Sequence, residues 1–170
     1  MERLSRLLDY PIKGLFWLGL AAGLMMMIHV AADVIGRTIF NYPLPGTTET
    51  VAAYYMVAVA YLPWAWLARH DQHIAAEYFT RKASPATAFW LDLAGKAATA
   101  LFVAAFTWQT LLRALRTTQA HESWQTAMGY LPVWPSRWLL PAAGSLMFAY
   151  LVLRIAADLA RRKSGARPAQ

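Results

Sequence analysis

Apolar residues gather in four long runs, and short polar segments separate these runs along the chain. Each run is long enough, at about 1.5 Å per residue, to cross about 30 Å of hydrocarbon as a helix. The pattern predicts an all-α integral membrane protein with four transmembrane helices, over about residues 14–40, 49–67, 86–112 and 138–159. No linker interrupts the pattern, so residues 1–170 are expected to form a single four-helix membrane domain.

The polar segments indicate how these helices are joined. The loop 41–46 contains two prolines, which should end the first helix, and Pro63 predicts a kink near one end of the second. Residues 71–82 are typical of a short helix lying in the membrane interface, because apolar and polar side chains fall on opposite sides. The apolar side holds Ile74, Ala75, Tyr78 and Phe79, and the polar side holds His73, Glu77 and Arg81.

Composition agrees with a membrane protein. Of the 170 residues 58% are apolar, which is more than one soluble domain of this size needs. The formal charge is +7, but the basic residues stand at the ends of the apolar runs and form no face with interleaved aromatic residues. This distribution argues against a nucleic acid partner and for contact with the lipid bilayer. The first apolar run exceeds the usual apolar part of a signal peptide, so we expect it to be retained as a span.

The distribution of Lys and Arg predicts the orientation in the membrane. One side would hold ten of these residues, namely Arg3, Arg6, Lys13, Arg69, Arg81, Lys82, Arg161, Arg162, Lys163 and Arg167. The other side would hold four, namely Arg37, Arg113, Arg116 and Arg137. The positive-inside rule then places both termini in the cytoplasm. The proline-containing loop and the long connection between the third and fourth spans would face outward.

Ionisable residues at membrane depth are the first candidates for a functional role. His29, Asp33 and Arg37 recur every four residues and therefore share one face of the first helix. They could form a proton or ion relay, but no further carboxylates stand at that depth. We therefore favour a pair of Asp33 with Arg37 on a face packed against protein. Asp92 and Lys96 have the same spacing near the start of the third span and can pair or snorkel.

Several other kinds of chemistry have little support in the sequence. The chain has no cysteine, which excludes disulfides and thiolate metal sites, and it has no Walker phosphate loop. Among four histidines only His29 lies well inside a span, which argues against haem or metal held between helices. We expect no enzyme activity, no cofactor and no bound metal. The alternative is a haem-binding membrane anchor of an electron-transfer complex, which haem absorbance of the purified protein would reveal. A homodimeric exporter built around an intramembrane glutamate is disfavoured, because Glu49 stands at a helix start.

Several segments resemble the small membrane subunit, the Q subunit, of tripartite ATP-independent periplasmic (TRAP) transporters. The resemblance runs from about residue 10 to residue 160 and is most specific in its first segment. The segments are 33–46 leading to Glu49, Arg69 with His73 and Ile74, 124–125 leading to 131–132, and 138–144. Alanines 142 and 143 precede Gly144 where a Pro-x-Gly pattern is expected, which weakens the match in the fourth helix.

The resemblance implies a non-catalytic small permease subunit in the inner membrane of a bacterium. Such a subunit is expected to brace the large membrane (M) subunit and to help dock the periplasmic substrate-binding (P) protein during sodium-driven uptake of an organic acid. The expected structural or partner-contact residues are Asp33, Arg37, Glu49, His73, Trp124, Pro132 and Trp138. We further predict that Arg37 and Glu49, which flank the turn after the first helix, pair and hold two helices in register. Asp33 is a competing partner for Arg37.

Overall fold

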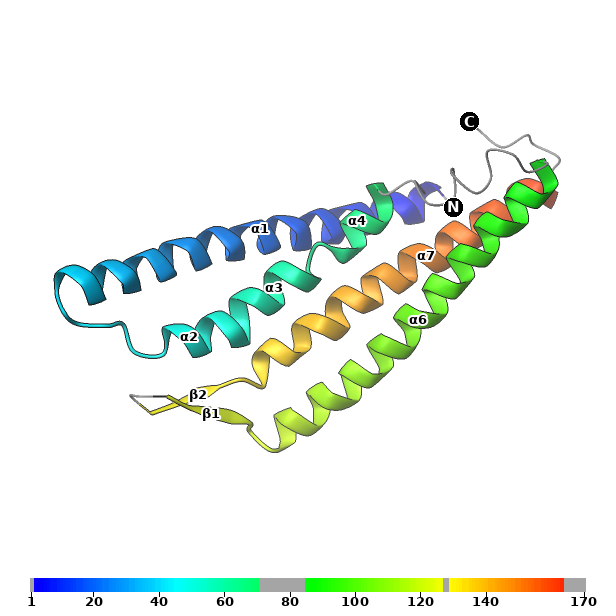
Figure 1. Ribbon diagram of the computed structural model, residues 1–170. Helices are drawn as coiled ribbons and strands as arrows, with labels where there is room; N and C mark the ends of the chain where they lie inside the picture. Colours follow the sequence, from blue (N-terminus) through cyan, green and yellow to red (C-terminus); the bar gives the residue numbers. More distant parts are fainter. Residues whose placement is uncertain (1, 71–84, 127–128, 164–170) are drawn as a thin grey trace.

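The computed structural model describes residues 2–70, 85–126 and 129–163, and most of these residues are helical (Figure 1). Within these ranges four stretches are long and apolar enough to cross a membrane, namely Leu8–Ile39, Thr47–Arg69, Thr87–Gln119 and Pro135–Ala160. The prediction of four such helices is therefore confirmed. The predicted interfacial helix over residues 71–82, with His73, lies outside the described residues.

The helices are α1 Glu2–Ile39, α2 Thr47–Thr50, α3 Met56–Tyr61, α4 Trp64–His70, α6 Pro85–Gln119 and α7 Leu139–Lys163. Several of them extend beyond the predicted spans: α1 begins at Glu2 rather than near residue 14, and α6 continues to Gln119 rather than 112. An apolar run marks only the part of a helix that lies in hydrocarbon. The backbone hydrogen bonds continue past that part until the chain reaches residues that end the helix.

The second span is a single helical rod with two irregularities. Pro63 lies between α3 and α4, and the kink predicted there is present as a break between these helices. The break follows from the missing N–H of proline, which cannot donate to the carbonyl one turn earlier. A π-helical turn, Val51–Tyr55, joins α2 to α3, and the N–H of Met56 donates to the Val51 carbonyl. No residue pattern had predicted this wider turn.

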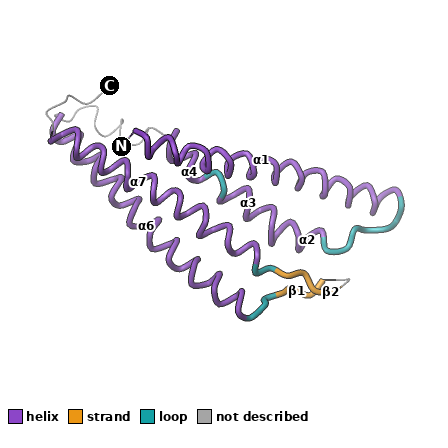
Figure 2. The backbone as a smooth tube through the Cα atoms, turned by 180° about the vertical axis from the view of Figure 1, so that it is seen from behind, coloured by secondary structure: helices purple, strands orange, loops and turns teal. Residues whose placement is uncertain are grey.

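The helices lie in a row in which α7 is central. One side of α7 packs against α6 and the other against α3 and α4, while α1 packs mainly against α3 and also contacts α4 and α7 (Figures 1 and 2). The Phe106 ring of α6 packs against the rings of Tyr61 and Trp64 in the second span. Its centroid lies 5.9 Å from that of Tyr61 and 5.2 Å from that of Trp64. The row leaves α1 at one edge and α6 at the other (Figure 2).

Small residues allow the central helices to approach closely. Ala58, Leu62 and Ala143 form one buried cluster between α3 and α7. At Gly144 of α7, an added Cβ would collide with the hydroxyl of Thr107 in α6. Glycine is therefore required where these two helices cross, because any side chain would force them apart.

A short β-hairpin corrects the all-α prediction. Strands β1, Ser123–Thr126, and β2, Gly129–Pro132, pair antiparallel with Trp124 opposite Leu131. Four residues per strand are too few for a clear alternating pattern, so the sequence predicts only a connection here. We call the end of the molecule with this hairpin and the α1–α2 loop the hairpin end, and the opposite end, where α1 begins and α7 ends, the terminal end (Figure 1).

Candidate functional site

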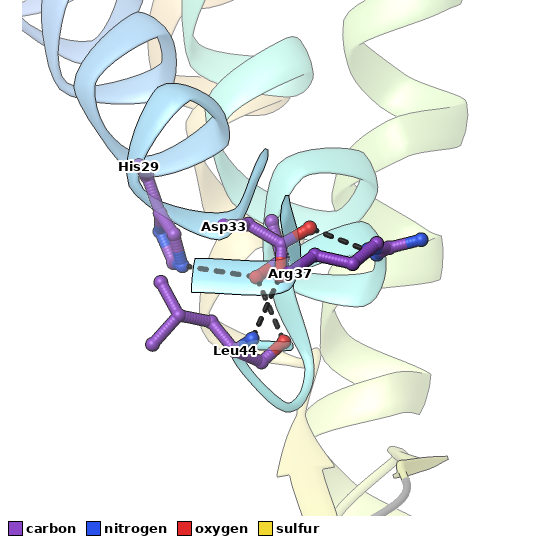
Figure 3. A network of polar contacts seen from close by, with 5 residues as sticks. His29, Asp33, Arg37 and Leu44 are labelled. Atoms are coloured by element: carbon purple, nitrogen blue, oxygen red, sulfur yellow. Dashed lines mark hydrogen bonds and ion pairs between the residues drawn. The ribbon is translucent and has the colours of Figure 1, made fainter. Parts of the chain in front are cut away.

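The α1–α2 loop is fastened to α1 by the carboxylate of Asp33, which is only 6% exposed. Its Oδ2 accepts a hydrogen bond from Nη2 of Arg37 at 2.9 Å, and its Oδ1 accepts one from the backbone N–H of Leu44 at 2.7 Å (Figure 3). One oxygen thus binds a guanidinium on its own helix, and the other binds a loop that lies 11 positions along the chain. Hydrogen bonds to a charged acceptor are among the stronger ones in proteins.

A second set of polar contacts joins the same loop to the second span. The Thr47 hydroxyl donates to the Leu44 carbonyl at 3.0 Å and lies 3.4 Å from Nε2 of His29. The other ring nitrogen of His29 lies 3.5 Å from the Tyr55 hydroxyl, which belongs to the π-helical turn. Asp33 therefore binds the loop directly, and His29, one turn earlier on α1, lies beside the Thr47 hydroxyl that binds the same loop residue, Leu44 (Figure 3).

The turn that leaves α1 depends on Gly36, which sequence reasoning did not single out. Its carbonyl accepts hydrogen bonds from the N–H groups of Phe40 and Tyr42 at 3.1 and 3.0 Å. A Cβ added to Gly36 would lie 2.8 Å from the Tyr42 carbonyl oxygen. Asn41, between them, adopts a left-handed conformation with φ 53°. The signal that could have revealed Gly36 is a glycine inside a charged helix end just before a proline-containing loop.

The charged residues of this region pair differently from the predicted register pair. Arg37 binds Asp33, and the described residues contain no ion pair between Arg37 and Glu49. The competing pair wins because Asp33 and Arg37 are one turn apart on the same helix, so their approach costs no loop ordering. Glu49 lies in the first turn of α2, where a carboxylate is favoured by the helix dipole.

The hairpin is contacted by the second span and by the α1–α2 loop, and a further hydrogen bond joins the segments that flank it. The hydroxyl of Tyr54, in the second span, donates to the carbonyl of Pro132 at the end of β2. Trp138 lies in the turn before α7, and its indole N–H donates to the Thr118 hydroxyl of α6 at 3.0 Å. The α1–α2 loop also meets the hairpin, because a Cβ added to Gly46 would lie 3.9 Å from Cγ2 of Thr126. Loop and hairpin therefore form one continuous surface.

A cluster of one carboxylate and two guanidiniums lies beside the hairpin. Glu122 stands 3.8 Å from Arg113 of α6 and 3.6 Å from Arg137, in the 3₁₀ turn Pro135–Trp138. Both distances exceed the normal length of a hydrogen bond, so these are loose ion pairs. The Nε of Arg137 is buried and has no hydrogen-bond partner within the described ranges.

Two ion-pair clusters fasten the terminal end. The guanidinium of Arg69, in α4, binds the carboxylate of Asp9, in α1, through both of its terminal nitrogens. Lys96 of α6 pairs with Asp92, as the spacing predicted, and also with Asp158 of α7 at 2.7 Å. The side chain of Lys96 is only 7% exposed, so its ammonium links α6 to α7 in a buried position. The second partner could not be predicted, because it depends on which helices are neighbours.

The fold and these polar contacts together define the class of protein. The chain is a multi-pass membrane protein whose polar side chains fasten helices, a loop and a hairpin to one another. Among the described residues, no three His, Cys, Asp or Glu side chains are grouped so that they could hold a metal ion. Trp124, Pro132 and Trp138 lie in or next to the hairpin, whereas Asp33, Arg37 and Glu49 surround the α1–α2 loop.

Comparison with known families identifies the chain more closely. The family model described as "Tripartite ATP-independent periplasmic transporters, DctQ component" matches residues 26–161. The chain belongs to this family and is the small membrane component of a TRAP transporter. No curated protein matches the chain. Members of this family of transporter components are generally non-catalytic, which agrees with sites that hold helices and loops in place.

Proposed function

We propose that this subunit works in the inner membrane of a bacterium, where it braces the large membrane subunit of its transporter and helps to dock the periplasmic substrate-binding protein. The uptake that it serves is proposed to be driven by sodium, with an organic acid as substrate. Membership of the DctQ family supports this proposal, because a tripartite transporter has other components that must be held together.

The bracing role is supported by how little of the chain is buried against itself. In the most apolar window of each span, between 6% and 28% of the residues are buried. A row of helices with so little internal contact leaves wide apolar faces for lipid and for a second membrane subunit. In a bilayer, association of such faces depends on close packing rather than on the hydrophobic effect.

The observation that carries the docking role is the fixed shape of the hairpin end. Asp33 holds the α1–α2 loop through Leu44, and Tyr54 holds the hairpin through Pro132. A surface that is already ordered loses less conformational entropy when a partner binds. The excess of Lys and Arg on the other side of the membrane supports an orientation with both termini in the cytoplasm and the hairpin end in the periplasm.

Two substitutions at Asp33 test the docking role. Asp33→Ala removes both acceptor oxygens and leaves the Leu44 N–H without its partner, a loss of about 1–3 kcal/mol for a buried group. We expect Asp33→Ala to weaken binding of the periplasmic protein to the reconstituted complex by about 10-fold, with a matching loss of uptake. Asp33→Asn keeps one acceptor and serves as the matched control.

The measurement is binding of the purified periplasmic protein to proteoliposomes, together with substrate accumulation at saturating sodium. If Asp33→Ala assembles normally with the large subunit yet binds and transports like the wild type, the hairpin end has no part in docking. If the variant fails to assemble with the large subunit although its loop is intact, Asp33 serves the bracing role instead of the docking role.

A further inference from the structure

An exposed stripe of side chains along α6 is apolar in its first half and polar and basic in its second half. Its members follow one another at intervals of three or four residues, so they lie on one face of the helix. They are Ala98, Phe102, Ala105, Gln109, Arg113 and Arg116, and every one of them is exposed. The first three are apolar, the fourth carries an amide, and the last two carry guanidinium groups.

This face belongs to the edge of the molecule, because α7 covers the opposite side of α6 (Figures 1 and 2). Phe102 is 64% exposed, and the Arg113 side chain is 67% exposed. Arg116 has no ion pair and Gln109 no side-chain hydrogen bond within the part of the chain that the structure describes. The stripe therefore keeps its donors available for a molecule outside the chain.

The charge of the region favours an anion. Arg113 and Arg137 flank a single carboxylate, Glu122, and Arg116 follows Arg113 by one turn of α6, so these four side chains carry a net charge of +2. Glu122 leaves the hydrogen-bond donors of Arg113 and Arg137 largely unused, because its carboxylate oxygens lie 3.8 and 3.6 Å from their guanidinium nitrogens. Normal hydrogen bonds between such groups are about 2.7–2.9 Å long.

The length of the stripe selects the kind of anion. Phe102 and Arg113 are 11 residues apart, which corresponds to about 16 Å along a helix. Half of a hydrocarbon layer of about 30 Å is about 15 Å. The stripe therefore places guanidiniums at the level of the headgroups and apolar side chains beside the acyl chains of one leaflet. Trp108 is next to the stripe and 62% exposed, as is typical of a tryptophan near the membrane interface.

We propose that this stripe is a binding site for an anionic phospholipid in the leaflet at the hairpin end. The headgroup phosphate accepts hydrogen bonds from Arg113 and Arg116, the amide of Gln109 donates to an ester oxygen of the lipid, and an acyl chain lies along Ala105, Phe102 and Ala98. The lipid site does not depend on which partners the subunit has. An experiment that contradicts lipid binding would therefore leave the proposed docking role untouched, and the reverse also holds.

Lipid binding at this face can be measured with a photoreactive residue, Gln109→benzoylphenylalanine, in the full chain reconstituted with and without the large membrane subunit. The liposomes contain equal amounts of phosphatidylglycerol and phosphatidylcholine with the same acyl chains. Mass spectrometry of the adducts gives the preference for the anionic lipid. We expect phosphatidylglycerol to dominate, and each of Arg113→Gln and Arg116→Gln to reduce that preference by about five-fold.

Arg116→Gln is the cleaner variant, because Arg116 is exposed and removing it breaks no ion pair among the described residues. Lys13→Gln, an exposed cation at the terminal end, is the matched control and should leave the preference unchanged. Equal labelling of the two lipids, a preference that survives loss of both arginines, or an adduct with a polypeptide would each overturn the proposal. Competition by millimolar glycerol phosphate would also overturn it, since the ligand would then be a soluble phosphate.

Discussion

At the scale of single residues, the hairpin end depends on a few groups that bind backbone rather than side chains. Asp33 accepts from the Leu44 N–H, and the Gly36 carbonyl accepts from two N–H groups of the turn. A loop with two prolines has few backbone donors, so each remaining donor needs a partner. The result is a loop whose path is set mainly by residues of α1.

Gly36 gives the sharpest test of this path. Gly36→Ala places a methyl group 2.8 Å from the Tyr42 carbonyl oxygen, so the loop must shift. We expect a loss of about 1–3 kcal/mol in the stability of this end, seen as faster hydrogen exchange at Leu44. Gly14→Ala on the same helix is the matched control, because nothing lies within 4 Å of its added Cβ. Unchanged exchange in Gly36→Ala would contradict the close approach.

The register pair of Arg37 and Glu49 can be tested by exchanging the charges. Because Arg37 binds Asp33, we expect Arg37→Glu to weaken assembly through repulsion from Asp33, whereas Glu49→Arg changes assembly little. The double exchange should restore nothing that Arg37→Glu loses. Recovery of assembly with the large subunit in the double variant would show that the two charges do meet in the complex.

At the scale of elements, α6 and α7 form the tightest pair, and their contact depends on Gly144 and Thr107. The Thr107 hydroxyl is buried and has no hydrogen-bond partner within the described residues. That hydroxyl fills the space that any side chain at Gly144 would occupy.

The contact between Gly144 and Thr107 predicts that a substitution at one position compensates for a substitution at the other. Gly144→Ala should destabilise the packing of α6 on α7 by about 1–3 kcal/mol, because the added methyl group collides with the Thr107 hydroxyl. Thr107→Ala in the same chain removes that hydroxyl and should recover most of the loss. The measurement is the midpoint of thermal unfolding in detergent for the two single variants and the double variant. Additive losses in the double variant would show that the two positions do not touch.

At the scale of the whole molecule, the two ends differ in charge and in structure. The terminal end carries most of the Lys and Arg, and its helices are joined by Asp9 with Arg69 and by Lys96 with Asp158. The hairpin end has fewer cations and contains the ordered loop and the hairpin. This asymmetry is the physical basis for predicting how the protein is oriented.

The orientation predicts the outcome of reporter fusions. A fusion after Gln170 and one near Ser84 should report the cytoplasm, and one after Gln119 should report the periplasm, because the terminal end carries the positive charge. Alkaline phosphatase, which is active only outside the cytoplasm, and a fluorescent protein that matures inside give opposite readings. A periplasmic reading at Gln170 would reverse the proposed orientation or change the number of spans.

The sequence predicted the features that depend on local pattern and missed those that depend on which elements become neighbours. Four apolar runs, the break at Pro63 and the pairs of Asp33 with Arg37 and Asp92 with Lys96 follow from spacing of one turn or from the chemistry of proline. The partnership of Lys96 with Asp158 required knowing that α6 and α7 are adjacent. The hairpin was missed because its strands are too short to give a periodic signal.

The ion pairs described above each lie within one half of the chain, whereas the hydrogen bond from Tyr54 to Pro132 joins the two halves. The first half, up to His70, contains both partners of the Asp9–Arg69 and Asp33–Leu44 contacts. The second half, from Pro85, contains both partners of the Lys96–Asp158 and Glu122–Arg137 contacts. During synthesis, the first two spans can therefore reach their final pairing before the third has left the ribosome. Each half would enter the membrane as a pair of helices whose ion pairs are already formed. Few charged groups would then lie in the bilayer before their partners are synthesised.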